Sequence, residues 1–448
     1  MSHAAAAPAP RFLSGSIMRH VVIMTLTGAV GLMSLFVVDL ADLYFLSLLN
    51  DTNVTAAIGY AGTLGFANLS ISIGIGIASA ALVARNLGAG NVDRAKDFAT
   101  TTLLFAVLMS GAYTLLVAFG AEYLLRLLGA QGEALLQAKR FIWTASPGYV
   151  MLAAAVSCSF SLRGLGDPRR AMYITLFMAI LTAIADPIFI FSFGLGMQGA
   201  AVANVLAQGI GLLFGLYGLV YVHKYLKPFS FAALKRDFPA IRAIAFPGML
   251  TQLATPFAVA YTTYSVAPYG NEAVAASAIV GRLVPVAFGM IFSLSGSVGP
   301  IIGQNFGARK MQRVTETLIE GLKFSAVYTL ITSAILYIFR HQIADVFLAG
   351  GRTKELVVFF CTWIALSWAF AGAQFVSNAA CNNLGKATHS TWFNWAKATI
   401  GTIPFAIIGG TYYGPEGIMA GIAVGSVIFG IASVWWAFRI VKNLNNEN

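Results

Sequence analysis

Charged residues are scarce in this sequence: Asp, Glu, Lys and Arg make up 10% of its 448 residues. Soluble domains typically carry about 25% charged residues. A chain of this length would form about two or three soluble domains, and it has too little charge to cover their surfaces. Hydrophobic residues make up 58% of the chain instead. The composition excludes a water-soluble protein and predicts one that crosses a membrane several times.

Cysteine is also rare, and a nucleotide-binding loop is absent. The three cysteines lie in or beside apolar segments and follow neither metal-ligand nor disulfide spacing; they are Cys158, Cys361 and Cys381. The pattern Gly-x4-Gly-Lys-Ser/Thr, which holds the phosphates of ATP, does not occur. We therefore expect no cofactor, no disulfide framework and no direct use of ATP.

Long apolar runs alternate with loops rich in charge, Gly or Pro. A helix needs about 20 apolar residues to cross the bilayer core. The runs are continuous and show no period of two, which excludes an outer-membrane barrel. They predict an all-α membrane protein with about twelve spans, at residues 17–48, 54–83, 99–125, 141–162, 171–193, 198–222, 243–269, 273–302, 321–340, 356–381, 390–411 and 415–438.

Basic residues are distributed unevenly over the predicted loops. When the termini and the even-numbered loops are placed on one side, that side receives 21 Lys and Arg residues. The other side receives 6, and Arg282 remains inside a span. Because Lys and Arg are enriched in cytoplasmic loops, the distribution predicts an even number of spans with both termini in the cytoplasm.

The second half of the sequence repeats the first at an offset of 219 residues. The loop ARNLGAGNVDRA at 84–95 returns as GQNFGARKMQRV at 303–314. Since six spans is an even number, the two copies have the same orientation in the membrane. The sequence thus predicts two pseudo-symmetric six-helix bundles joined by a basic cytoplasmic linker, with the divisions 1–222, 223–242 and 243–448.

Three acidic residues fall inside predicted spans, where a charged side chain is costly and usually faces the protein interior. Asp39 and Asp42 are three residues apart in the first span and so share a helix face. Asp186 lies in the fifth span, directly before a proline that removes a backbone hydrogen bond. Two close carboxylates at low dielectric constant resist being ionised together, which suits the uptake and release of a proton. The repeat-related positions of the second half carry no acid; they are Ala258, Tyr261 and Pro404.

The order of several short motifs resembles the multidrug and toxic compound extrusion (MATE) family over essentially the whole chain. The motifs are LADLYFL at 40–46, the paired loops at 84–95 and 303–314, LRGLGDP at 162–168 and IADPIFIF at 184–191. The restriction of the membrane acids to the first half resembles the DinF branch of that family. The resemblance implies that Asp42 and Asp186 hold the coupling ion in the N-terminal bundle.

Two positions near these acids depart from the family pattern. The family's Asn four residues before the fifth-span acid is Thr182 here, and its Thr eighteen residues after that acid is Asn204. Both side chains still offer oxygen ligands, so the set fits Na⁺, and a proton-only site fits as well. The predicted coupling-ion site for H⁺ or Na⁺ is Asp39, Asp42, Asp186, Thr182 and Asn204.

Polar and aromatic residues of the second half are candidates for lining a substrate cavity: Gln252, Tyr261, Tyr264, Arg282, Gln374 and Asn378. Packing inside the bundle explains each of them at least as well. Arg282 fits either a counter-ion in the cavity or a partner of polar groups within the second bundle. For Lys397 we expect the long side chain to reach towards the cytoplasmic side.

These observations favour a secondary antiporter of the cytoplasmic (inner) membrane that is not an enzyme. It would export lipophilic, often cationic, small molecules in exchange for H⁺ or Na⁺, because a bound coupling ion cancels the negative charge that attracts such a cation. We expect a monomer surrounded by membrane lipid, with drug-like substrates, no nucleic acid and no obligate protein partner.

Two alternatives remain open at this point. A flippase for lipid-linked sugars, built on a related two-bundle fold, would need several Lys and Arg in its cavity, and only Arg282 lies deep in a span. An intramembrane prenyltransferase would use Asp39 and Asp42 to hold Mg²⁺ on a diphosphate. It would also need a second acidic cluster, and the sequence offers only Asp186.

Overall fold

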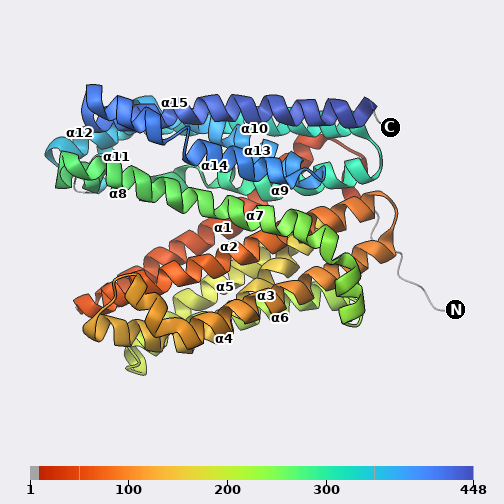
Figure 1. Ribbon diagram of the computed structural model, residues 1–448, viewed down its shortest axis with the longest axis horizontal. Helices are drawn as coiled ribbons and strands as arrows, with labels where there is room; N and C mark the ends of the chain where they lie inside the picture. The colour runs from red at the N-terminus through yellow and green to blue at the C-terminus, as the bar shows by residue number, and fades with distance from the viewer. Residues whose placement is uncertain (1–9, 50, 348, 447–448) are drawn as a thin grey trace. The chain divides into compact units, whose positions relative to one another are not determined.

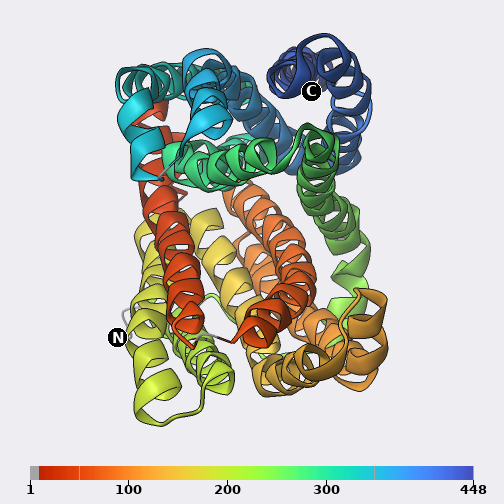
Figure 2. The same cartoon turned by 90° about the vertical axis from the view of Figure 1, so that its left-hand side faces the viewer.

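The computed structural model describes residues 10–49, 51–347 and 349–446, so the first nine residues of the predicted first bundle lie outside the described part. Nearly all of this part is helical and none of it forms a strand (Figures 1 and 2). Ten segments are long and apolar enough to cross a membrane, and a bent pair of helices makes an eleventh. The last of the ten, Ala387–Asn446, is folded back on itself at Gly414 and so contains two spans. The predicted twelve-span, all-α fold is confirmed.

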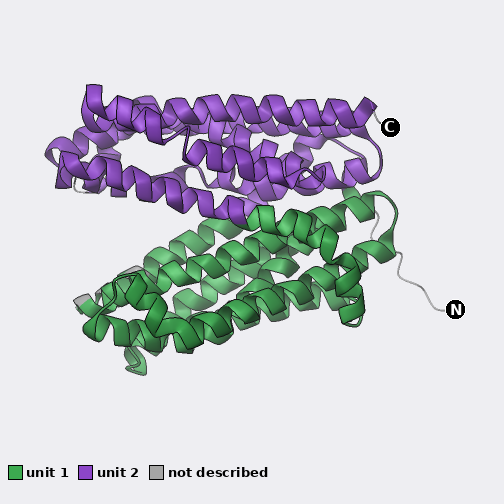
Figure 3. Ribbon diagram, viewed as in Figure 1, with its two compact units in different colours: residues 1–11, 30–249 green, residues 12–29, 250–448 purple. Residues whose placement is uncertain are grey.

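Of the described residues, unit 1 contains residues 10–11 together with Val30–Met249 (Figure 3). Its central helix is α4, which packs against α2, α3, α5 and α6. Its helices are α1 (Ile17–Ser47, in part), α2 (Thr52–Gly88), α3 (Val92–Leu127), α4 (Gly132–Gly164), α5 (Pro168–Pro187), α6 (Met197–Tyr217) and the first part of α7 (Phe231–Val266). Buried polar contacts fix their register: Ser110 donates to Asn68 Oδ1 at 2.7 Å, and Asn68 Nδ2 donates to the Tyr149 carbonyl oxygen at 3.1 Å.

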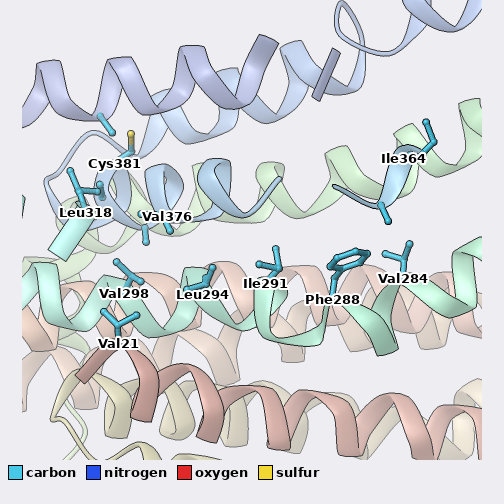
Figure 4. Close-up of a cluster of buried hydrophobic side chains, with 14 of the residues drawn as sticks. Val21, Val284, Phe288, Ile291, Leu294, Val298, Leu318, Ile364, Val376 and Cys381 are labelled. Atoms are coloured by element: carbon cyan, nitrogen blue, oxygen red, sulfur yellow. The ribbon is translucent and has the colours of Figure 1, made fainter. Parts of the chain in front are cut away.

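Unit 2 contains Phe12–Ala29 and the chain from Leu250 onward. Its helices are the rest of α7, α8 (Asn271–Ala287), α9 (Gly289–Gly307), α10 (Met311–Ile338), α11 (Arg340–Val346), α12 (Gly351–Phe359), α13 (Trp368–Asn383), α14 (Ala387–Ala398) and α15 (Ile403–Asn446). Apolar side chains of α9, α10, α13 and the first half of α1 form its core (Figure 4), among them Val21, Leu294, Val298, Leu318 and Val376. Because lipid tails are as apolar as these side chains, their contacts stabilise unit 2 through close packing and not through removal from water.

The helix boundaries repeat at the predicted offset of 219 residues. α2 covers residues 52–88, and α8 with α9 covers residues 271–307. The second copy is more interrupted, since α8 and α9 meet at a bend of 47°. Pro285 in the last turn of α8 explains this bend, because proline cannot donate a backbone hydrogen bond and its ring collides with the preceding turn.

Two helices contribute to both units. α1 passes from unit 2 to unit 1 between Ala29 and Val30, and α7 passes from unit 1 to unit 2 after Met249. The first half of α1 is tied to unit 2 by hydrogen bonds as well as by apolar contacts. For example, Ser297 of α9 donates to the carbonyl oxygen of Met24 at 3.0 Å.

Close backbone contact between glycines shows that α15 is a hairpin of two helices. The chain turns at Gly414, whose φ of +60° and ψ of −145° are not helical, and Pro415 begins the second helix. A Cβ atom on Gly425 would meet the backbone of Gly401, and one on Gly417 would meet the backbone of Gly409. Small residues at such positions let membrane helices approach closely. Spans eleven and twelve are therefore antiparallel neighbours.

The basic stretch predicted as a linker is irregular at its start and enters α7 at Phe231, twelve residues before the predicted seventh span. Its basic side chains pair with acids of unit 1. Lys227 Nζ lies 2.7 Å from Asp97 of α3, and Arg236 lies 2.9 Å from both Asp97 and Asp237. These ion pairs attach the first turns of α7 to α3.

Candidate functional site

The three membrane acids come from two helices of unit 1. Asp39 and Asp42 lie on the half of α1 that belongs to this unit, and Asp186 is the second-last residue of α5. A π-helical turn follows at Ile188–Ser192. The wider turn fits the proline at position 187, which cannot donate an ordinary helical hydrogen bond, and π-helical turns are frequent at functional sites.

Asp42 connects the other members of this acid site. Its Oδ2 accepts a hydrogen bond from Asn204 Nδ2 of α6 at 3.4 Å. Its carboxyl group also interacts with the Asp186 side chain and, through space, with the charge of Asp39. α1, α5 and α6 thus bring together Asp42, Asp186 and Asn204, three of the residues predicted for the coupling-ion site.

The three acids differ in how deeply they are buried. Asp186 is fully buried, and neither of its carboxyl oxygens accepts a hydrogen bond from a described residue. Asp42 is half-buried and its Oδ1 is likewise buried without a donor. Asp39, by contrast, is exposed. Asp42 and Asp186 therefore form the inner part of the site, and Asp39 lies at its edge.

Thr182 occupies the helical turn before Asp186 and is buried. Its hydroxyl donates to the carbonyl oxygen of Met178 at 3.0 Å, so this proton is not directed at an acid. The hydroxyl oxygen keeps lone pairs for a cation. No group of three or more His, Cys, Asp or Glu residues that could hold a metal ion occurs among the described residues. A Na⁺ ion here would thus combine two carboxylates with the neutral oxygens of Thr182 and Asn204.

The arrangement has a simple chemical consequence. Two carboxyl groups that interact directly have one side-chain donor between them, Asn204. Burying unpaired negative charge is expensive, and a proton or a monovalent cation between the two groups removes that cost. Binding and release of one such ion therefore changes the net charge inside unit 1.

The cavity candidates of the second half do not gather in one place. Tyr261 and Tyr264 line a cavity of about 330 Å³ in unit 2, bordered by Tyr269 and by Gly410 and Ile418 of α15. Gln252 is half-buried on α7 and Arg282 is exposed on α8, and neither borders this cavity. Gln374 and Asn378 are buried on α13.

One polar contact of unit 2 involves a residue absent from the predicted set. Asn394 Nδ2 of α14 donates to Asn378 Oδ1 at 3.1 Å. The sequence contains an indication of its importance, because Asn394 precedes Lys397 by three residues and therefore shares its helix face.

Comparison with known proteins identifies the same architecture. The chain is 28% identical over 436 residues to an "FAD transporter" of Shewanella oneidensis, with 96% of each chain covered. It is 24% identical over 436 residues to the "Probable multidrug resistance protein YpnP" of Bacillus subtilis, again with 96% of each chain covered. Its fold is similar to that of the Vibrio cholerae MATE transporter VcmN in the bent form, with a TM-score of 0.91, 24% identity and coverage of 96% of this chain and 98% of that chain.

The family model MatE matches the chain twice, over residues 29–188 and 247–408. The two matches begin 218 residues apart, in agreement with the repeat. Together they cover most of the chain and both of its halves. The chain therefore belongs to the MatE, or multidrug and toxic compound extrusion, family of membrane transporters.

Proposed function

We propose that this transporter exports lipophilic, often cationic, small molecules in exchange for H⁺ or Na⁺. The proposal rests on the contact between Asp42 and Asp186 in unit 1. Asp186 is fully buried, and neither of its carboxyl oxygens has a hydrogen-bond donor among the described residues. This pair is negative when empty and neutral or less negative when it holds the coupling ion. The multidrug names of several relatives support the substrate class.

The cycle follows from charge. A negative site attracts a lipophilic cation through Coulomb attraction, which is strong at low dielectric constant. Arrival of the coupling ion cancels part of that charge, so the substrate is released where the ion is more abundant. We place this cycle in a monomer in the cytoplasmic membrane, with both termini in the cytoplasm.

The test is ethidium efflux from proteoliposomes, driven separately by a pH gradient and by a Na⁺ gradient. Wild-type protein should show efflux with at least one gradient, and Asp42→Asn should lose it. Glu316→Gln serves as the matched control, because it also removes one carboxylate, from an exposed position in α10. If neither gradient drives ethidium efflux, or if wild type and Asp42→Asn export ethidium equally, the proposal is wrong.

A second candidate substrate is a flavin dinucleotide. The relative that covers 96% of both chains at 28% identity is named an FAD transporter, which favours this substrate over an unrelated one. Efflux of FAD from the same proteoliposomes tests it directly. Loss of FAD efflux in Asp42→Asn would place both substrates on one cycle, whereas absence of FAD efflux in wild type would remove this candidate.

The two other hypotheses have different standing. Membership of a transporter family excludes the intramembrane prenyltransferase. The flippase for lipid-linked sugars stays an alternative within the transporters, and it becomes the next one to test if no gradient moves ethidium or FAD.

A further inference from the structure

The fifth helix of the second repeat is broken shortly before the position that corresponds to Asp186 in the first. α14 ends at Ala398 and α15 begins at Ile403. Pro404, the repeat partner of Asp186, explains the interruption because it cannot continue the hydrogen bonds of the preceding helix. Interrupted membrane helices frequently border substrate sites. The charged residue beside this break is Lys397, in the last turn of α14.

Lys397 lies on the inward face of α14. Residues 390, 394 and 397 recur every three or four positions and so share one face. On that face Ser390 is buried, and Asn394 donates to Asn378 of α13. The side chain of Lys397 is therefore directed along the face that packs inside unit 2 and is half-buried, so the expectation that it reaches towards the cytoplasmic side was wrong.

The hydrogen bond between Asn394 and Asn378 sets the register of α13 against α14. The two helices are joined by a short turn at residues 384–386 and run in opposite directions. One turn back along α13 is Gln374, which is 3% exposed and whose buried Nε2 finds no acceptor among the described residues. One turn forward along α14 is Lys397. The amide donor of Gln374 and the ammonium group of Lys397 are thus at the same level of unit 2.

No acid balances this lysine within the described residues. The ion pairs of unit 2 use Lys323, Arg352 and Lys354, and none includes Lys397. Neither α13 nor α14 contains Asp or Glu. Lys397 follows the first residue of α14 by ten positions, which corresponds to about 15 Å along the helix. A lysine this deep in a membrane protein is costly and by default marks a binding or transport pathway.

We propose that Lys397 and Gln374 form a binding subsite of unit 2 for the carboxylate or phosphate of a transported small molecule. Both groups are hydrogen-bond donors, and Asn378 and Asn394 hold the two helices in register around them. The subsite deepens the proposed transport function and rests on it, since it extends the substrate class from cations to molecules that carry an acidic group. Unit 1 supplies the acids and unit 2 supplies the base.

Binding of FMN and of riboflavin to the full-length protein in nanodiscs tests this subsite. Both probes carry the same flavin ring, and only FMN carries a phosphate. We expect wild type to bind FMN at least tenfold more tightly than riboflavin, and Lys397→Gln to reduce this preference to about twofold or less. Lys397→Arg should retain most of it. Lys442→Gln, which removes an exposed lysine of α15 in the same unit, should leave it unchanged.

The proposal is overturned if the wild type binds neither probe or shows no preference for FMN over riboflavin. It is also overturned if Lys397→Gln prefers FMN as strongly as the control Lys442→Gln does. Binding of riboflavin by Lys397→Gln shows that this variant is folded, so a lost FMN preference reports on the phosphate alone. Ethidium efflux separates this result from the proposed antiport. If efflux depends on Asp42 while FMN preference is absent, only the subsite fails.

Discussion

The carboxyl group of Asp186 accepts no hydrogen bond from any described residue although it is fully buried. A structural acid in a protein core is normally surrounded by donors, because an unsatisfied buried charge costs more than almost any other defect. Asp167 of the same unit shows the contrast. It accepts hydrogen bonds from His223 Nε2 at 2.9 Å and from the Arg170 backbone at 3.3 Å, and it forms an ion pair with the Arg170 guanidinium.

Asp186→Asn should therefore separate transport from stability. Asparagine has the same shape and can still form a hydrogen bond with Asp42, so the free energy of unfolding should change by less than about 1 kcal/mol. It cannot release a proton or supply a charge to Na⁺, so gradient-driven ethidium efflux should fall to background. Thermal unfolding and proteoliposome efflux measure the two quantities.

Asp39→Asn is the matched comparison, since it makes the same change at the exposed edge of the site. It should retain most of the efflux. A large loss of thermal stability in Asp186→Asn would assign Asp186 to packing instead, and equal loss of efflux in both variants would move Asp39 into the inner site.

Asp167 should contribute stability that depends on pH. Burial alone would raise the pKa of Asp167, but the hydrogen bonds from His223 and Arg170 lower this pKa well below its usual range. The stabilisation is therefore complete above the unfolded-state value of about 3.9 and is lost as the pH falls further. Asp167→Asn should cost about 1–3 kcal/mol at pH 6.

Thermal unfolding of wild type and Asp167→Asn in detergent from pH 6 to pH 3 checks this expectation. The difference between their unfolding temperatures should shrink as the pH approaches 3. A difference that stays constant over this range would mean that the ionised carboxylate is not what stabilises the end of α4 and the start of α5.

At the scale of elements, the hairpin of α15 depends on backbone contact that tolerates no side chain. A Cβ on Gly425 would collide with the backbone of Gly401, whereas a Cβ on Gly281 of α8 meets nothing within 4 Å. Gly425→Ala should therefore lower stability by about 1–3 kcal/mol. Gly281→Ala should be neutral or raise stability by up to about 1 kcal/mol, because alanine favours the helix.

Fluorescence-detected gel filtration with thermal challenge compares these two variants. The same substitution is made in both, so a difference reports on the close approach and not on helix propensity. Equal melting temperatures would show that spans eleven and twelve have room to separate.

The helices could be predicted from the sequence where the length of an apolar run alone determines them. Twelve spans and the offset of 219 residues follow from hydropathy and loop repetition, and the structure reproduces both. The break between α14 and α15 does not follow from length alone, because the segment 390–411 is long enough for one span although it contains Lys397 and Pro404. The sharing of α1 between units depends on contacts such as Ser297 with Met24, which a one-dimensional pattern does not contain.

The site was predictable in the same limited sense. Charge inside an apolar span identified Asp42 and Asp186, and the family resemblance supplied Asn204, which contacts Asp42. The depth of each acid depends on neighbours from other helices, so the exposure of Asp39 could not be read from its spacing of three residues. The positions of Gln252 and Arg282 away from the cavity of Tyr261 and Tyr264 have the same origin.

At the scale of the whole molecule, the two copies of the repeat have corresponding helices but carry different charged residues. The outer limits of the helices match in the two copies although the second copy is more interrupted, yet the first carries Asp42 and Asp186 and the second carries Lys397. Packing requirements would favour similar residues in both copies. The opposite charges therefore point to different tasks for the two units, and ion coupling is the task that we propose for unit 1.

This division requires that both copies cross the membrane in the same direction, and the loops allow a direct test. The native cysteines are all buried, so a membrane-impermeant maleimide should leave the unmodified chain nearly unlabelled. Ser230→Cys lies in the predicted cytoplasmic linker and Gln131→Cys in a loop of the predicted outer side, and both positions are exposed. With 21 of the loop Lys and Arg residues assigned to the cytoplasmic side, intact cells should label only Gln131→Cys, and inside-out vesicles only Ser230→Cys. The reverse labelling pattern would mean that the protein has the opposite orientation in the membrane. Labelling of both positions from the same side would contradict an even number of spans in the first half, and the two copies of the repeat would then not be parallel.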